Sequence, residues 1–185
     1  RVFRIKSRDT NLFRISRTNG VSRRLIAGSL SLEEAYTELE QIYTEQSIQH
    51  DLVFKFIAAS IVSLSFLYLQ DGKLIDILTA LLAGSFGYLV TEILSRKLHT
   101  HFIPEFMGAL VIGFIAVTGH NLIPGGSVET IIIASVMPIV PGVLITNSIQ
   151  DLFGGHMLMF ITKSLEALVT AFGIGAGVGT ILIIF

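Results

Sequence analysis

Residues 128–147 read VETIIIASVMPIVPGVLITN, a stretch of 20 residues that is almost wholly apolar and yet contains two prolines. A helix needs about 20 mostly apolar residues to cross the hydrocarbon layer of a bilayer. Pro138 and Pro141 each remove an amide donor and displace the carbonyl four residues earlier, which belongs to Ala134 or Met137. The stretch therefore predicts a membrane-spanning helix that is broken in its second half.

Apolar stretches of similar length lie on both sides of this one. They run over about 52–69, 75–94, 103–119 and 158–185, with short polar connections between them. Hydrophobic residues make up 51% of the 185 residues and charged residues only 15%, whereas a soluble domain carries about 25% charged residues. We expect an all-α integral membrane protein with about five transmembrane helices, and an ordinary soluble enzyme is excluded.

Charge is concentrated in the first part of the chain. Residues 1–51 hold eight of the 13 Lys and Arg residues and seven of the 14 Asp and Glu residues, while all four prolines come later. We therefore divide the chain into a polar segment, 1–51, and a transmembrane domain, 52–185. Because the chain begins with Arg1 and not with Met, we expect further residues before the polar segment.

The polar segment contains one predicted strand and two predicted helices. Residues 1–6 alternate basic and apolar side chains, which is typical of a short strand. A helical pattern runs over about 10–27 and ends at Gly28, and Ser31 with Glu34 forms a capping box at the start of the second helix. Acidic residues nearly neutralise the basic ones, so we expect a solvated cytoplasmic helix pair and no nucleic-acid partner.

The distribution of Lys and Arg predicts the orientation of the transmembrane domain. Cytoplasmic connections carry an excess of these residues. With the N-terminus inside, the inner side holds the eight basic residues of the polar segment, and the outer connections hold only Lys73. The other inner-side cations are Lys55, Arg96, Lys97 and Lys163. We expect a multi-pass protein of the cell inner membrane with a cytoplasmic N-terminus and the C-terminus outside.

Small residues recur at a spacing of four in several spans, which favours close helix packing within the bundle or between subunits. In the last span, Ala171, Gly175 and Gly179 share one face, and Gly173 and Gly177 share the neighbouring face. The glycine-rich run does not follow a strand and has no phosphate-loop lysine, so it is not a nucleotide site.

The broken span and the residues after it are the candidate functional site. Secondary transporters place substrate and ion sites at broken helices, where backbone groups line a cavity. Two interpretations remain open, a transport site and a structural proline kink in which Asp151 caps the next helix. The transport interpretation uses Pro138, Pro141, Gly142, Thr146, Asn147 and Asp151, of which the last two share a helical face.

Ionisable residues inside spans normally form pairs or line a pathway. Lys163 and Glu166 stand three apart in the last span, and they either pair with each other or form a polar gate at the inner side. Glu166 and Asp151 are the candidates for a carboxylate that takes up a proton. We interpret Glu92 and Glu105 as solvated span ends, and Glu129 as a charge at a helix N-terminus.

No catalytic or cofactor constellation is evident. The chain has no cysteine, and its five histidines lie in connections or at span ends. His99 and His101 are two apart and do not share a helical face, so we expect no metal and no cofactor. An intramembrane enzyme is an alternative with little support, and a membrane scaffold that binds a partner is another.

At three places the chain resembles the threonine/serine exporter family, specifically its N-terminal-type domain. The stretches are SLEEAYTELEQI (31–42), MPIVPGVLITNSIQDLFGGH (137–156) and KSLEA (163–167) before the glycine-rich last span. The resemblance extends over nearly the whole chain, and the order of five spans agrees. Two departures are Gln150 and Lys163, which stand where family members often carry Arg.

The resemblance implies a transporter driven by the proton motive force that exports a small polar metabolite. Threonine and serine are the usual substrates, and a dicarboxylate such as succinate is the alternative. It also implies a smaller companion membrane subunit or domain, or an oligomer. A zwitterionic amino acid needs one anionic and one cationic partner, whereas a dianion needs two cations. The few cations of the spans therefore favour the amino acid.

Overall fold

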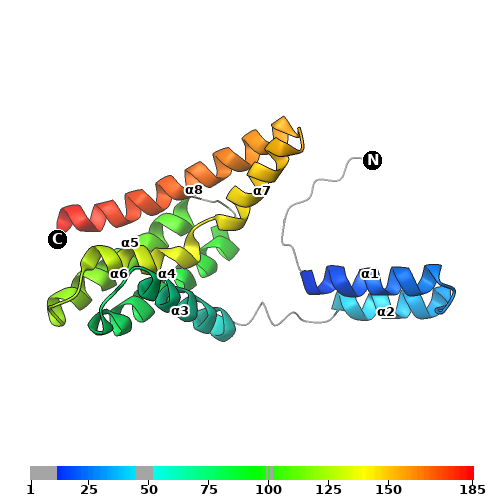
Figure 1. Cartoon of the computed structure of the whole chain (residues 1–185), viewed down its shortest axis with the longest axis horizontal. Helices are drawn as coiled ribbons and strands as arrows, with labels where there is room; N and C mark the ends of the chain where they lie inside the picture. The colour runs from blue at the N-terminus through cyan, green and yellow to red at the C-terminus, as the bar shows by residue number, and fades with distance from the viewer. Residues whose placement is uncertain (1–11, 45–51, 99, 101) are drawn as a thin grey trace. The chain divides into compact units, whose positions relative to one another are not determined.

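The computed structural model describes residues 12–44, 52–98, 100 and 102–185 (Figure 1). The chain divides into two compact units, Arg1–His50 and Asp51–Phe185, and each is described by itself. All regular structure in the described residues is helical. The strand predicted at 1–6 lies outside the described residues.

The first unit is a pair of helices, α1 (Leu12–Ile26) and α2 (Leu32–Thr44). Between them, Gly28 adopts a left-handed conformation with φ +72°, which glycine tolerates without steric cost. Ser31 and Glu34 form the predicted capping box at the start of α2. The Glu34 amide donates to Ser31 Oγ over 3.3 Å, and the Ser31 amide donates to Glu34 Oε2 over 2.9 Å. The buried side chains between the helices are Val21, Ala35 and Ile42.

The second unit is all-helical and has the apolar helices expected of a membrane domain. Four helical segments are long and apolar enough to cross a membrane, and a fifth span is formed if a bent helix pair is counted as one. The elements are α3 (Leu52–Leu69), η2 (Leu74–Asp76), α4 (Ile77–Leu98), α5 (Ile103–Leu122), α6 (Val128–Val136), η3 (Met137–Ile139), α7 (Gly142–Phe153) and α8 (Met157–Ile184). The predicted all-α membrane fold is confirmed.

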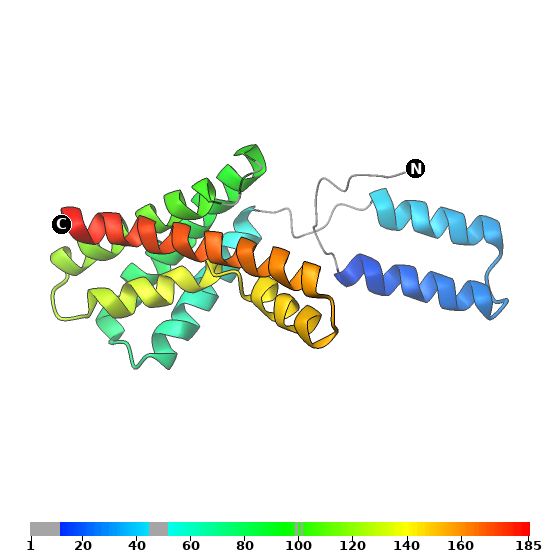
Figure 2. The ribbon, with the colours of Figure 1, turned by 90° about the horizontal axis from the view of Figure 1, so that it is seen from above.

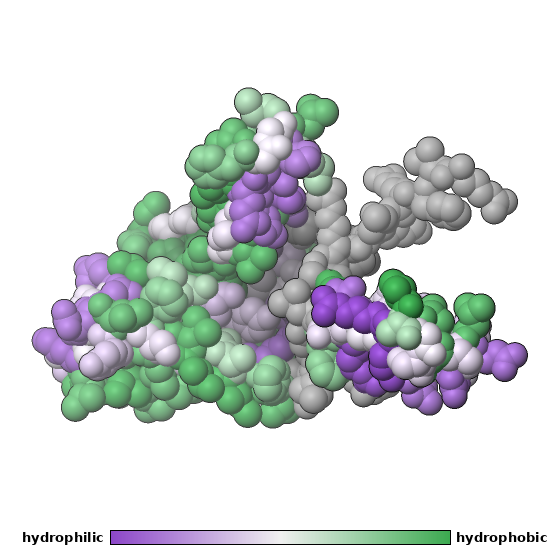
Figure 3. Space-filling model, turned by 45° about the vertical axis from the view of Figure 1, so that its right-hand side comes forward, coloured by the Kyte–Doolittle hydropathy of each residue, from purple (hydrophilic) through white to green (hydrophobic). Residues whose placement is uncertain are grey.

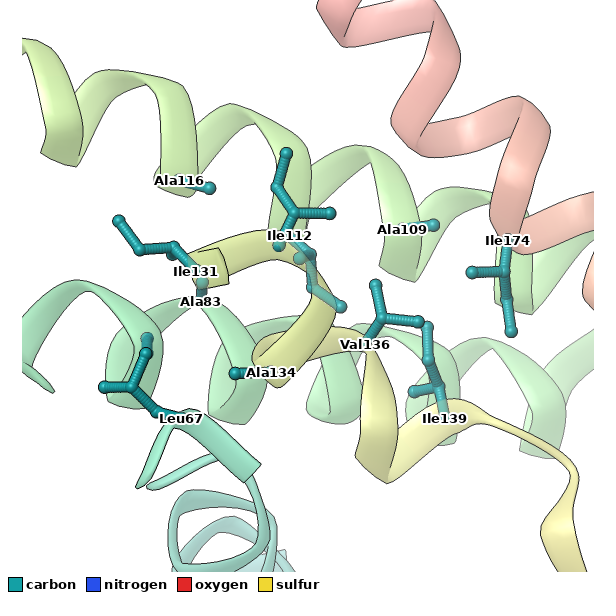
Figure 4. Packing of buried hydrophobic residues seen from close by; sticks show 12 residues of the cluster. Leu67, Ala83, Ala109, Ile112, Ala116, Ile131, Ala134, Val136, Ile139 and Ile174 are labelled. Carbon is teal, nitrogen blue, oxygen red and sulfur yellow. The ribbon is translucent and has the colours of Figure 1, made fainter. Parts of the chain in front are cut away.

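Helices α3, α4, α5 and α6 pack together, and α8 lies along α5 (Figure 1). Helix α7 packs chiefly against α8, with which it forms a hairpin at one end of the unit (Figure 2). Small and branched side chains from these helices interlock in the core, as Figure 4 shows around Ile112 and Ile131. Helix α6, the first half of the broken span, therefore contributes side chains to the hydrophobic core of the bundle, whereas α7 contributes none to this cluster.

Glycines allow two of these helix contacts to be close. A Cβ atom at Gly108 of α5 would lie 2.8 Å from the Gly87 carbonyl of α4. In α8, a Cβ atom at Gly177 would lie 2.5 Å from the Phe106 carbonyl of α5, whereas nothing lies within 4 Å of one at Gly175 or Gly179. Only one of the two small-residue faces of α8 therefore packs within the unit.

Candidate functional site

The two prolines break the span as predicted. The 3-10 turn η3 ends at Ile139, Val140 is extended with φ −64° and ψ 131°, and α7 begins at Gly142 after a bend of 63°. The Met137 carbonyl, which we expected Pro141 to leave free, accepts from the Val140 amide over 3.3 Å. A 3-10 turn forms bonds three residues apart, so it satisfies this carbonyl where an α-helical bond would be missing.

Helix α7 presents the predicted polar residues after the break. Asn147 and Asp151 lie four apart in α7 and so share one face, and both are partly buried. Thr146 is exposed, and its hydroxyl donates to the Gly142 carbonyl over 3.0 Å within its own helix. The face that carries Asn147 and Asp151 is therefore the polar surface that α7 offers next to the break.

A salt bridge joins this face to α8. Lys163 Nζ donates to Asp151 Oδ2 over 2.5 Å, and about a fifth of each side chain is exposed. The hairpin brings the two residues together because Gly155, with φ +75°, reverses the chain and the His156 amide bonds to the Asp151 carbonyl over 2.8 Å. We call Asn147, Asp151 and Lys163 the hairpin site.

Two sequence interpretations change at this point. Asp151 lies inside α7 and its carboxylate meets Lys163, so it does not cap the next helix. Lys163 was interpreted either as a partner of Glu166 or as part of a polar gate with it; in the structure the Lys163 ammonium contacts Asp151 of α7, because the hairpin folds α7 back along α8. Glu166 is partly buried one turn further along α8.

In Figure 3 a strip of hydrophilic residues lies within the mainly hydrophobic surface of the α7–α8 hairpin.

Comparison with known protein families matches residues 1–185 to ThrE, described as "Putative threonine/serine exporter". The chain belongs to this exporter family. No match was found among curated proteins or among solved structures. ThrE is a transporter family, so the chain is a multi-pass membrane protein with a substrate to move. The family assignment agrees with the resemblance drawn from the three sequence stretches.

A second group of charges lies at the same end of the ThrE membrane unit, where α3 begins and α4 ends. Glu92 Oε1 accepts from Lys55 Nζ over 2.6 Å and from Arg96 Nε over 2.8 Å. The interpretation of Glu92 as a solvated span end is wrong, since only 20% of its side chain is exposed. Opposite charges at the ends of consecutive spans were the sequence signal for this group.

A third group lies at the opposite end of the unit, and the sequence interpretation missed it. Asp76 ends η2 and is only 3% exposed, although it stands inside a predicted span. Nearby, Ser127 caps α6 by accepting from the Thr130 amide, and its hydroxyl donates to Glu129 Oε2 over 2.8 Å. Glu129 thus lies in the first turn of a helix, as predicted. An acidic residue inside an apolar span was the available signal for Asp76.

The described part of the ThrE chain holds no group of three His, Asp or Glu side chains placed to bind a metal ion. His50, His99 and His101 lie outside the described residues. The chemistry available at the hairpin site is therefore that of one carboxylate, one ammonium and one amide side chain, next to an interrupted helix.

Proposed function

We propose that this ThrE chain exports threonine or serine across the cell inner membrane and that the proton motive force drives the export. The observation that carries the proposal is the Lys163–Asp151 salt bridge on the polar face that follows the helix break. It supports a zwitterionic substrate, because an amino acid brings one cation and one anion of its own.

Binding at the hairpin site replaces one salt bridge by two. The substrate ammonium binds the Asp151 carboxylate, and the substrate carboxylate binds the Lys163 ammonium. Each charge keeps an opposite partner at every stage, so the site avoids the high cost of a lone buried charge. A dicarboxylate brings two anions, and the Asp151 carboxylate would repel them.

Neighbouring groups give the site its selectivity in this proposal. Asn147 lies one turn from Asp151 towards the break, and its amide bonds to the hydroxyl of threonine or serine. The backbone from Pro138 to Gly142 supplies further polar groups where the helix is interrupted. Glu166, one turn beyond Lys163, forms an inner-side gate together with the Lys163 ammonium.

The proposed orientation places the hairpin site on the cytoplasmic side, where an exporter takes up its substrate. Lys55, Arg96, Lys97 and Lys163 lie at helix ends on that side, and Lys73 lies at the opposite end of the unit. This asymmetry supports a cytoplasmic N-terminus by the excess of positive charge on the inner side. We also propose a smaller companion membrane subunit, or an oligomer, as the partner of this chain.

The test is efflux from proteoliposomes preloaded with labelled threonine or labelled succinate, with and without an imposed pH gradient. The liposomes contain the chain alone or the chain with its proposed companion. Threonine efflux that depends on the gradient is the expected result. Succinate efflux without threonine efflux would overturn the substrate, and efflux of neither by folded protein would favour the scaffold alternative.

Variants of the salt bridge test the site itself. Asp151→Asn leaves the Lys163 ammonium without its partner, and we expect threonine efflux to fall by at least about tenfold, which corresponds to about 1.4 kcal/mol. Gln150→Asn, on an exposed neighbour, is the matched control and keeps its efflux.

A charge exchange separates transport from structure. Asp151→Lys combined with Lys163→Asp keeps a salt bridge between α7 and α8 but reverses its polarity relative to Asn147. We expect this double variant to fold and to remain inactive. Recovered efflux in the double variant would mean that the salt bridge only holds the hairpin together.

A further inference from the structure

The helix pair of the first unit has a small core. The buried side chains are Val21, Ala35 and Ile42, with Leu25 and Leu30 packed against them. Units of about 40 residues or fewer usually need a disulfide, a metal or association with another chain to fold stably. The chain has no cysteine, so a disulfide is excluded, and association would need an uncovered apolar surface.

Helix α2 has such a surface, a row of apolar and exposed side chains. The members of the row are Leu32, Tyr36, Leu39 and Tyr43. They follow one another at intervals of four, three and four residues, which is the spacing of a single helix face. Leu39 is 39% exposed, and each of the others is at least 69% exposed. The buried Ala35 and Ile42 lie on the adjacent face, so no described residue of α1 covers this row.

A shorter row on α1 lies on the same side of the pair. Arg24 and Glu38 form a salt bridge along the opposite side. Successive residues of a helix are about 100° apart, so Ile15 and Ile26 lie on the flank of α1 away from Arg24, as the α2 row lies away from Glu38. The helices run antiparallel (Figure 1), which brings both rows onto one surface. We call this surface the apolar face; its members are Ile15, Ile26, Leu32, Tyr36, Leu39 and Tyr43.

The two helices carry opposite charges. Helix α1 has four arginines and no acidic residue, and α2 has four glutamates and no basic residue. A second helix pair placed face to face can set its α2 over α1, or its α1 over α1. The first arrangement brings an acidic helix over a basic one at both contacts, whereas the second brings like charges together. Charge complementarity therefore favours the first arrangement, which is a four-helix bundle.

A lipid bilayer fits the apolar face less well. Helices that lie on a membrane carry Lys and Arg on their polar face, and the cytoplasmic leaflet is negatively charged. The charged residues of α2 are all glutamates, which this leaflet would repel. Tyrosine is also enriched in contacts between proteins, and two of the six members of the apolar face are tyrosines.

We propose that the apolar face binds the same face of a second copy of this chain, with α1 of each copy over α2 of the other. The two-fold axis runs along the helices, so both α2 helices finish at the same end of the bundle, and both chains can continue into one membrane. The inference rests on the oligomer included in the proposed function, and it does not depend on the substrate.

Cross-linking between two differently tagged copies of the whole chain tests this arrangement in membranes. Because α1 begins where α2 ends, Ile15→Cys in one copy lies over Tyr43→Cys in the other. A disulfide needs Cα atoms within about 7 Å, so oxidation should give at least about fivefold more heterodimer than the control pair. The control replaces Ile15→Cys by Phe13→Cys, which is 65% exposed on the side of the Arg24–Glu38 salt bridge.

Two results of the cross-linking would overturn the proposal. The first is a heterodimer yield no higher than that of the control pair, which is what a face covered by lipid or by a different protein would give. The second is a heterodimer of Ile15→Cys with Ile26→Cys in place of the expected one, since this pair meets only if α1 lies over α1.

A charge exchange tests the pairing of unlike helices. Arg23 and Glu33 are exposed, and each lies about half a turn from the buried row of its own helix, so they can meet only between copies. Arg23→Glu or Glu33→Arg should each lower the heterodimer yield about threefold, as expected for an exposed charge pair, and their combination should restore it. A combination that stays as low as the single variants would contradict the arrangement.

A charge placed within the apolar face tests its burial. Tyr36 is 69% exposed in the single helix pair, so Tyr36→Glu should leave the pair folded but bury an unpaired charge in the dimer. We expect the heterodimer yield to fall by about tenfold, which corresponds to about 1.4 kcal/mol. Phe13→Glu, of similar exposure on the opposite side, is the matched control and keeps its yield. An unchanged yield in Tyr36→Glu would overturn the proposal.

Threonine efflux by the same chain in proteoliposomes separates this inference from the proposed function. The expected heterodimer without threonine efflux would contradict the proposed substrate and leave the interface standing. Gradient-driven efflux without the heterodimer would contradict the interface alone.

Discussion

At the scale of residues, two salt bridges of the membrane unit join side chains from different helices. Lys163 of α8 forms a salt bridge with Asp151 of α7, and Lys55 of α3 forms a salt bridge with Glu92 of α4. Charge inside a span is costly, so each group is stable where the fold supplies an opposite charge. The removal of a single partner therefore affects both stability and transport, which is why the charge-exchange variant is needed at the hairpin site.

The capping box of the first unit makes a prediction about pH. The pKa of Glu34 is lowered from its ordinary value of 4.5 because the Ser31 amide, and then the Ser31 hydroxyl, donate to its carboxylate. A lowered folded-state pKa means that the stabilisation is present above the unfolded value and is lost as pH falls through the folded value. Ser31→Ala should speed amide exchange at the start of α2 about fivefold, for a cost of about 1 kcal/mol.

Hydrogen-exchange mass spectrometry of the whole chain measures this effect. Exchange in residues 32–44 is compared between parent and Ser31→Ala at several pH values, after correction for the intrinsic rate. Glu34→Gln is the control, since glutamine keeps a capping box but does not titrate. An acid-dependent loss of protection in α2 that persists in Glu34→Gln would exclude Glu34 as its cause.

At the scale of elements, the two small-residue faces of α8 make different predictions. Gly177→Ala places a Cβ atom 2.5 Å from the Phe106 carbonyl, so α5 and α8 must separate. We expect a loss of about 1–3 kcal/mol. Gly175→Ala meets nothing within 4 Å and should leave the unit as stable or slightly more stable, because alanine favours the helix. Thermal unfolding in detergent compares them, and equal midpoints would contradict the α5–α8 contact.

The bend between α6 and α7 is a second prediction at this scale. Pro138→Ala with Pro141→Ala restores two amide donors, so we expect the bend of 63° to decrease. Spin labels on cysteines introduced at Ile133 and Ile149, both 46% exposed, should then move apart in pulsed electron paramagnetic resonance. Pro124→Ala, in the loop before α6, is the control. An unchanged distance in the double variant would mean that packing, and not proline, sets the bend.

At the scale of the whole molecule, our proposal for how the second unit lies in a bilayer rests on its apolar exterior and on the distribution of its charges. Many large hydrophobic side chains are exposed on α3, α5 and α8, where lipid covers them. Four of the five Lys and Arg residues of the unit lie at one end and only Lys73 lies at the other, so the proposed orientation places the first end in the cytoplasm.

Cysteine accessibility in cells checks this orientation. Lys97→Cys, at the end of α4, should react with an impermeant maleimide only after permeabilisation, and Asn121→Cys, at the end of α5, should react from outside. Both side chains are exposed, so the two sites differ in the side of the membrane and not in burial. The reverse pattern would place the N-terminus outside.

The sequence alone determined the features that depend on local chemistry. Apolar length predicts the spans, the capping box predicts the start of α2, and the two prolines predict the break, because each follows from backbone hydrogen bonding within a few residues. The family resemblance rested on stretches of the same kind.

Which charges meet depends on how the helices pack, and the sequence did not predict it. Periodicity along one helix relates Asn147 to Asp151, but it says nothing about Lys163 on the next helix or about Lys55 facing Glu92. Asp76 is buried by a loop that lies about fifty residues further along the chain, and the closeness depends on Gly126. Such contacts arise from how helices rotate and cross as they pack, which local sequence patterns do not specify.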